Sequence, residues 1–144
     1  MGLELDFSKV EAKLESLQRK AKSQTIHESL RAGAEVVERE IKQEIISNDH
    51  IDTGILYDSI KETKLYIRGT SSWIRVGIDP NARNPYSANG KKRKEPRPVT
   101  IYGFVLEHGT KWKAGTHWMS NAKNRSYDES REAIAKELKK RLGL

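Results

Sequence analysis

The chain has 144 residues, which is enough for one domain with its own core. Its 27 Lys and Arg outnumber its 20 Asp and Glu, giving a net charge of +7, and its mean hydropathy is −0.78. The lack of cysteine excludes a disulfide framework, a thiolate zinc site and a cysteine nucleophile. No run approaches the ~20 apolar residues of a membrane span, so we expect no membrane partner.

Two amphipathic helices are predicted at the start of the chain. Apolar residues recur every three or four positions from Leu3 to Ala21, which predicts a helix over residues 3–23, with a capping box at Ser8 that favours a start there. This stripe favours a helix lying on a core over a coiled-coil helix. A second stripe predicts a helix over residues 25–47 with a capping box at Thr25. Gly33 weakens that helix by about 1 kcal/mol relative to Ala, and would allow another backbone to approach closely.

A β-hairpin is predicted next. Apolar and polar residues alternate over 63–68 and 73–78, around Gly69-Thr70-Ser71-Ser72. A turn centred on Thr70–Ser71 would pair Ile67 with Ile74 on a half-buried face, and with them Leu65 with Val76 and Thr63 with Ile78. The other face would allow aromatic–guanidinium stacking among Tyr66, Arg68, Trp73 and Arg75.

Residues 79–98 differ in composition from the rest of the chain. They hold all four prolines, an Asn-Gly step, and six Lys and Arg against two acids, so about +4 of the net charge lies here. This composition predicts a basic, mobile loop without regular structure, either functional or disordered. The possible contacts with a partner or DNA are Lys91, Lys92, Arg93, Lys94 and Arg97. A solvated loop tip is the alternative.

The last third of the chain predicts two further elements. Periodicity does not decide between a buried strand and a short buried helix for residues 99–107. Residues 118–142 predict a long closing helix, whose C-terminal cations suit the helix dipole. We expect an α+β fold in a single domain, 1–144: N-terminal helices, an antiparallel β-sheet with a central hairpin, a short helix near Tyr102 and a long C-terminal helix.

Searches for catalytic chemistry are mostly negative. The sequence contains neither a common nucleotide-binding loop nor a serine nucleophile elbow. Glu107, His108 and His117 flank one loop and could ligate a metal, but bonds to backbone or water are favoured, and we expect no cofactor. The carboxylates Asp49, Asp52 and Asp58 favour turn capping over a calcium site.

Three segments carry a resemblance to a known family. They are Asp52–Ile60, similar to D-T-G-x-L-x-x-S-I; Tyr102–Thr110, similar to Y-x-x-x-x-E-x-G-T; and His117–Ala122, similar to P-F-L-x-x-A. Their order and spacing over residues 5–142 resemble the tail-completion and minor tail-component proteins of long-tailed bacteriophages. The motif residues are Asp52, Thr53, Gly54, Leu56, Ser59, Ile60, Tyr102, Glu107, Gly109, Thr110, Trp118 and Ala122. His117 stands where the family usually has Pro, and the basic insertion is long.

The resemblance implies a structural protein without catalysis. It implies a ring of copies at the neck of the virion, reached from the host cytoplasm. The implied partners are the tail tube and terminator proteins and the head connector, with DNA in the neck lumen as a further candidate. A basic nucleic-acid-binding protein and a small ribonuclease toxin are the alternatives.

Physical roles for the motifs can be stated without the family. Asp52 and Thr53 can cap the segment that follows, and Gly54 can adopt a positive φ. Glu107 can accept bonds from the N–H groups of the following Gly-Thr turn or pair with a Lys, or else act as a general base beside His108. Trp118 can pack the last helix onto the sheet.

Overall fold

The computed structural model describes residues 8–20, 23–50 and 53–144. Its helices are α1 (Ser8–Lys20), α2 (Ser23–Ser47), α3 (Ile55–Asp58), α4 (Val99–His108) and α5 (Trp118–Leu142). Its strands are β1 (Ile60–Glu62), β2 (Tyr66–Arg68), β3 (Ser71–Trp73), β4 (Val76–Ile78), β5 (Arg83–Tyr86), β6 (Lys92–Pro98), β7 (Gly109–Thr110) and β8 (Lys113–Ala114). The α+β class is confirmed. Leu3, Phe7, Ala21 and Asp52 lie outside the described residues.

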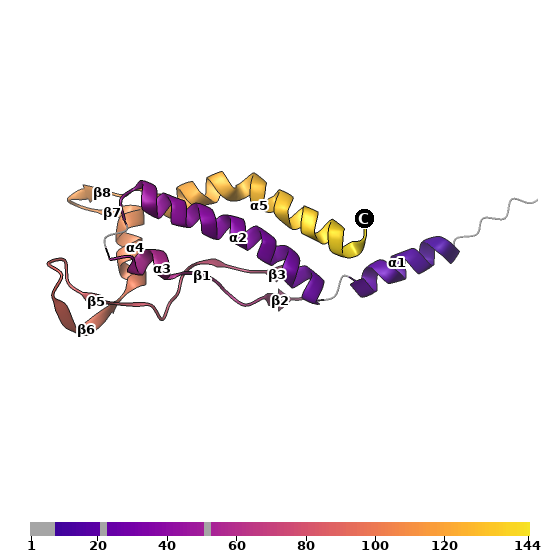
Figure 1. Ribbon diagram of the computed structural model, residues 1–144, viewed down its shortest axis with the longest axis horizontal. Coiled ribbons are helices and arrows are strands. Elements are labelled where there is room, and N and C mark those ends of the chain that lie inside the picture. The colour runs from indigo at the N-terminus through magenta and orange to yellow at the C-terminus, as the bar shows by residue number, and fades with distance from the viewer. Residues whose placement is uncertain (1–7, 21–22, 51–52) are drawn as a thin grey trace, which may run out of the picture.

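The long helices α2 and α5 lie side by side along an elongated molecule (Figure 1). A Cβ added to Gly33 would lie 2.5 Å from the Ile134 side chain and 3.1 Å from the carbonyl oxygen of Ser130. Gly33 therefore lets α5 approach α2 closely, which confirms the expectation for this glycine.

The hydrophobic core lies at one end of this pair, where α4 crosses it (Figure 1). The buried residues at this end come from α2, α3, β1, α4 and α5; they are Ile41, Ile45, Leu56, Ile60, Val99, Trp118 and Ala122. The apolar run 99–107 is thus a helix that presents only one face to the core. We call this region, from α3 and β1 through α4 to the start of α5, the packed end.

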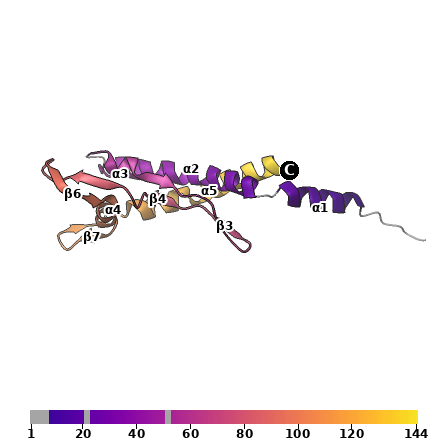
Figure 2. The same ribbon diagram turned by 90° about the horizontal axis from the view of Figure 1, so that it is seen from below.

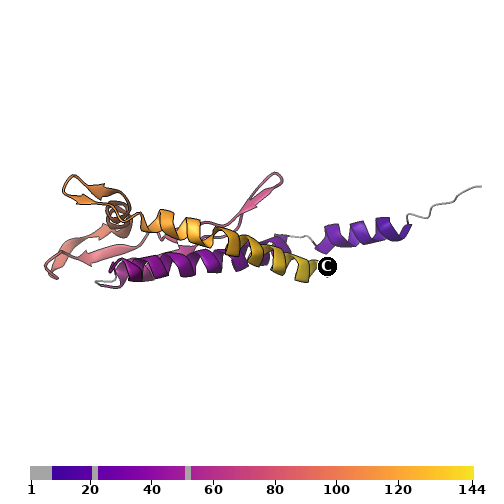
Figure 3. The same cartoon turned by 90° about the horizontal axis from the view of Figure 1, so that it is seen from above.

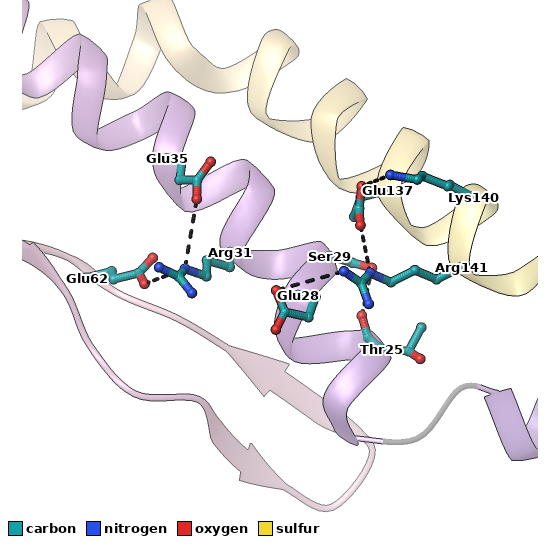
Figure 4. Close-up of polar contacts among 9 residues, drawn as sticks. All are labelled: Thr25, Glu28, Ser29, Arg31, Glu35, Glu62, Glu137, Lys140 and Arg141. Atoms are coloured by element: carbon teal, nitrogen blue, oxygen red, sulfur yellow. Dashed lines mark hydrogen bonds and ion pairs between the residues drawn. The ribbon is translucent and has the colours of Figure 1, made fainter.

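At the other end of the pair, an ion pair joins α5 to α2 (Figure 4). Arg141 donates from Nε to Glu137 at 2.6 Å and lies 3.9 Å from Glu28, so it links α5 to α2. The Ser29 hydroxyl donates to the carbonyl oxygen of Thr25 at 2.8 Å. Ser23 and Gln24 are already helical, so Thr25 lies inside α2 and the capping box predicted at Thr25 is wrong.

The strands form four antiparallel pairs: β1–β4, β2–β3, β5–β6 and β7–β8. The predicted register of the β2–β3 hairpin is wrong: Ile67 lies opposite Ser72, not Ile74. The reason is the turn, which is centred on Gly69–Thr70, where Gly69 has a φ of +59° that a two-residue hairpin turn accommodates. In the β1–β4 pair, Ile78 lies opposite Ile60 rather than Thr63.

The β2–β3 hairpin extends away from the helices (Figure 3). Ile67 is 57% exposed, so the predicted half-buried face is absent at the tip. The predicted aromatic face is confirmed in part: the rings of Tyr66 and Trp73 stack with centroids 6.0 Å apart, and the guanidinium of Arg75 lies 5.9 Å from the Tyr66 ring.

Residues 79–98 fold into a β-hairpin rather than the predicted irregular loop. β5 pairs with β6, with Asn84 opposite Arg97 and Tyr86 opposite Lys92. The register shifts between Asn84 and Tyr86, at Pro85, which has no N–H to donate to the ladder. The basic run therefore lies on an ordered strand and its turn. The mobility of this hairpin stays a prediction.

Helix α1 lies beyond the end of the α2–α5 pair (Figures 1 and 2). Ser8 is already helical and the residues before it lie outside the described ranges, so the capping box predicted at Ser8 stays a prediction. The apolar residues Val10 and Leu14 of α1 are 55% and 54% exposed, so the expectation that the stripe lies on a core is wrong for these residues. The core is at the opposite end of the molecule.

Candidate functional site

The three motif segments converge at the packed end. Leu56 from α3, Ile60 from β1, and Trp118 and Ala122 from α5 are each at most 3% exposed and belong to one buried cluster. The structure thus brings together residues that the sequence separates by more than 60 positions.

The first motif forms a short helical turn. Gly54 has a φ of +73° directly before α3, a conformation that glycine adopts without strain. No described side chain caps α3, so the capping role predicted for Thr53 is wrong, and Asp52 lies outside the described residues. The buried Ser59 hydroxyl donates to the carbonyl oxygen of Leu56 at 2.7 Å, which closes the turn.

Glu107 caps α5. Its carboxylate accepts the backbone N–H of Met119 at 2.7 Å, the N–H of Ser120 at 3.2 Å and the Ser120 hydroxyl. The prediction that it binds its own Gly-Thr turn is wrong, because the unpaired N–H groups at the start of α5 lie within its reach. These groups and the helix dipole attract a carboxylate.

The pKa of Glu107 reflects this environment. Burial raises the pKa of its carboxyl, but the bonds from Ser120 and Met119 outweigh burial and hold the pKa below its usual value. Glu107 is only 8% exposed, so these bonds replace most of its contact with water.

Trp118 joins α5 to α4. It is 1% exposed, and its indole N–H donates to the carbonyl oxygen of Gly103 at 3.2 Å. A Cβ on Gly103 would collide with the Ile78 side chain but would only touch the ring of Trp118, so this glycine makes room for Ile78. Trp118 was predicted to pack α5 onto the sheet. Its indole N–H instead donates to a backbone carbonyl of α4, because α4 lies across the start of α5.

The second motif ends in the β7–β8 turn. The Thr110 hydroxyl accepts the N–H groups of Trp112 and Lys113, each at 3.2 Å. Gly109 and Gly115 bring their backbones too close for a Cβ on either residue. The role of Gly115 was not predicted from the sequence, where its only signal was its position between two motifs.

The histidines do not form a metal site. His108 packs on Phe104 with ring centroids 4.4 Å apart, while Glu107 is engaged by α5. Within the described ranges, no three His, Cys, Asp or Glu side chains are placed to hold a metal ion. His117 has a φ of +52°, which a proline could not adopt, so its departure from the family pattern is also a backbone difference.

Two buried polar residues were missed from the sequence. Glu44 is 2% exposed and pairs with Arg125 at 2.7 Å, linking α2 to α5. His50 bonds the hydroxyl of Thr116 at 2.9 Å, and burial, followed by the charge of Lys113, lowers its pKa. The available signal for Glu44 was a charged residue seven positions after Val37, on the apolar stripe of α2.

The five predicted contact residues lie on the β5–β6 hairpin. Lys91, Lys92, Lys94 and Arg97 are exposed, and none of the five forms an ion pair with a described residue. Arg93 instead helps to line a hollow between the hairpin and α4, together with Thr53, Tyr86 and Tyr102. The basic hairpin is thus attached to the packed end.

The hairpin is anchored at Asp79. Its carboxylate accepts the N–H of Asn81 at 2.9 Å and pairs with Lys61 at 3.1 Å. These bonds, that of Asn81 first, lower the pKa of Asp79.

Comparison with known families decides the class of protein. Residues 8–109 match the sequence profile of the family described as "Bacteriophage HK97-gp10, putative tail-component". The chain belongs to the HK97-gp10-like family of phage tail components. The matched range includes the first motif, the basic hairpin and the second motif as far as Gly109, and it ends before Thr110 and Trp118. No curated protein and no solved structure matches the chain.

Membership of the HK97-gp10-like family makes the chain a bacteriophage structural protein of the tail, and its location the virion. No helix in the described part of the chain has the length and apolar composition to cross a bilayer.

Proposed function

We propose that the chain is a tail-completion protein that assembles as a ring at the joint between tail and head. The observation that carries this proposal is an exposed apolar face of α4 on a member of a tail-component family. Ile101, Phe104 and Val105 on α4 are 57%, 63% and 37% exposed. Exposed apolar patches of this kind mark contacts with other proteins, and this chain is otherwise polar.

The partners in this proposal are other copies of the chain, the tail tube and terminator proteins, and the head connector. The basic hairpin adds a surface for an acidic neighbour or for DNA in the neck lumen. Its exposed lysines carry no paired carboxylate in the described part of the chain, so their charge is available to a phosphate or an acidic side chain.

Association of free copies is weak in this proposal. A net charge of +7 repels identical copies at low salt, and the polar composition gives little surface for a large obligate interface. Ring formation therefore depends on the assembling tail. Sedimentation at micromolar concentration should show monomers or small oligomers, and a stable ring without tail or connector would contradict this.

The proposed role involves no catalysis. The alternative, in which Glu107 is a general base beside His108, is disfavoured because its carboxylate is engaged by three donors at the start of α5. A ribonuclease would lose its cleavage activity when Glu107 is replaced, whereas a structural protein would lose stability.

Disruption of the gene in the phage that encodes it tests the proposed function. Electron microscopy should show filled heads and finished tails that fail to join, and supplying the chain in trans should restore joining. Normal joined virions without the chain would refute the proposal. A loss of DNA packaging with joining intact would favour the nucleic-acid-binding alternative.

A further inference from the structure

We infer that neighbouring copies contact each other head to tail, with the apolar stripe of α1 on one copy lying on the exposed face of α4 on the next. This inference rests on the proposed assembly of copies into a ring and names the two surfaces that make the contact.

The first surface is the outer face of α4. Ile101, Phe104, Val105 and His108 follow one another at spacings of three, one and three, which places them on one side of a helix. The opposite side, with Val99, Gly103 and Glu107, is buried in the packed end. Phe104, 63% exposed, has only the His108 ring as its aromatic partner among the described residues. Burying these side chains would be favourable, at roughly 25 cal/mol per Å² of apolar surface.

The second surface is the stripe on α1. Val10 and Leu14 are more than half exposed, and Leu17 continues the stripe one turn further. A short isolated helix is marginal in water, because most helical stability comes from packing of an apolar face. The stripe of α1 is therefore a surface that a second protein surface would stabilise.

The two surfaces match in length. Each extends over eight residues, Val10 to Leu17 and Ile101 to His108, and the seven steps between its ends make two helical turns or about 10 Å. Side chains with this spacing on two helices can interdigitate, ridges into grooves.

Their positions favour contact between copies. The stripe on α1 and the face of α4 lie at opposite ends of the elongated molecule in two perpendicular views (Figures 1 and 2). Two different surfaces at opposite ends make a heterologous contact, and repetition of such a contact gives a ring when the rotation closes. One contact of this kind per copy covers both surfaces in every subunit.

On one flank of the α1 stripe the charges are complementary to those beside α4, while Lys9 and Lys13 lie on the other flank. Glu11 and Glu15 lie along one flank of the α1 stripe, while Lys111 and Lys113 follow α4 in the β7–β8 turn. None of these four forms an ion pair with a side chain that the structure describes, which on α1 leaves out those of residues 19 and 20. Pairing them across the contact would offset part of the repulsion between copies that each carry +7.

Cross-linking between two single-cysteine variants tests this inference. The natural chain has no cysteine, so Leu14→Cys and Phe104→Cys each introduce the only thiol. The two full-length variants, distinguished by tags of different size, are mixed at high concentration and treated with a mild oxidant. We expect the Leu14→Cys/Phe104→Cys heterodimer to exceed either homodimer several-fold.

Ala12→Cys is the matched control, because Ala12 is an exposed residue on the side of α1 away from the stripe. Its yield with Phe104→Cys should be several-fold lower than that of Leu14→Cys. An equal yield, or no heterodimer at all, would overturn the inference. Dominant Leu14→Cys homodimers would overturn it too, since they would show a coiled coil between two α1 helices.

A charge exchange provides a second test. Replacing Glu11 and Glu15 with Lys on the Leu14→Cys variant should lower the heterodimer yield. Replacing Lys111 and Lys113 with Glu on the Phe104→Cys variant should then restore it. A yield that ignores both changes contradicts the pairing.

The outcome can be separated from that of the proposed function. If the unsubstituted chain restores head–tail joining but no Leu14→Cys/Phe104→Cys product forms, the contact is wrong and the function stands. If the product forms but the chain restores no joining, the contact stands and the function is wrong.

Discussion

Two tryptophans illustrate the difference between two regions of the molecule. Trp118 in the packed end is 1% exposed and bonds α4, whereas Trp112, at the tip of the β7–β8 turn, is 83% exposed. The packed end carries the buried motif residues, while the β2–β3 and β5–β6 hairpins extend away from the helices and α1 lies at the opposite end of the molecule (Figure 3). This difference shows that the motif residues mainly maintain the fold. The surfaces available to partners are formed mostly by other residues.

Replacing each tryptophan with alanine should show the largest difference in stability between the two regions. Trp118→Ala removes a fully buried ring and should lower the free energy of unfolding by about 3–5 kcal/mol. Trp112→Ala should change it by about 0.5 kcal/mol or less. Urea denaturation measures both, and equal losses would show that the packed end is not the stable part of the molecule.

Glu107→Ala should have the next largest effect. It leaves the N–H groups of Met119 and Ser120 unpaired at the start of α5, at a cost of about 1–3 kcal/mol in the free energy of unfolding. Glu95→Ala, on the exposed hairpin, is the matched control and should be close to neutral. A Glu107→Ala variant that melts like the natural chain and still supports joining would refute the structural role.

The contribution of Glu107 should also depend on pH. Its pKa is lowered in the folded chain, so the unfolded chain binds the proton more readily, and stability is lost as the pH falls. The stabilisation should be complete well above the unperturbed value of 4.5 and decrease in the acid range below it. Urea denaturation at several pH values should therefore show the natural chain and Glu107→Ala converging in acid. A constant difference down to low pH would contradict the charged cap.

Gly33→Ala tests the helix pair that connects the two regions. Alanine favours a helix, but here its Cβ would lie 2.5 Å from the Ile134 side chain, so we expect a net loss of about 1–2 kcal/mol from overpacking. Gly77→Ala is the control, because no atom lies within 4 Å of its added Cβ. Thermal unfolding compares the two. A stabilised Gly33→Ala would show that α5 can move away from α2 without cost.

The basic hairpin should affect binding and leave stability unchanged. Replacing Lys91, Lys92 and Lys94 with Gln should change the free energy of unfolding by about 0.5 kcal/mol or less. If the hairpin binds DNA, each phosphate that a lysine no longer neutralises lowers the slope of log affinity against log salt by about 0.9. Replacing Lys136, Lys139 and Lys140 at the end of α5 removes the same charge and is the control. An equal change in slope for both sets would show that binding follows net charge alone.

Hydrogen exchange compares the local stability of the two regions without any substitution. A two-stranded hairpin is marginally stable alone, so the amides of residues 86–95 should exchange much faster than those of α5 around Ala122. Strong protection of residues 86–95 in the free chain would contradict the prediction that this hairpin is mobile.

The sequence predicted the long helices better than the β2–β3 and β5–β6 hairpins, for physical reasons. The bounds of α5 and the C-terminal end of α2 are as expected, because long apolar stripes and turn residues mark them. The register of β2–β3 was missed because a single glycine, Gly69, sets a turn that alternation alone does not specify. Irregular structure was predicted for residues 79–98 because prolines and lysines oppose packing, yet the backbones of β5 and β6 pair with each other, which composition alone does not reveal.

The sequence predicted which residues belong to the candidate site, but it did not predict which groups they contact. Gly54 and the buried Trp118 have the backbone and burial that local patterns suggest. The partner of Glu107 was missed because it lies 12 positions along the chain, across a loop whose path the sequence does not specify. The exposure of α1 was missed for a similar reason, since an amphipathic stripe shows that a helix has a partner without showing which one.

Localisation of the chain in intact virions tests the central claim most directly. A small tag at the exposed C-terminal end, Leu144, can be detected with gold particles by electron microscopy of phage that depends on the tagged chain. The account predicts gold at the junction of head and tail and nowhere else along the particle. Gold distributed along the tail tube, or virions that carry no label, would contradict it.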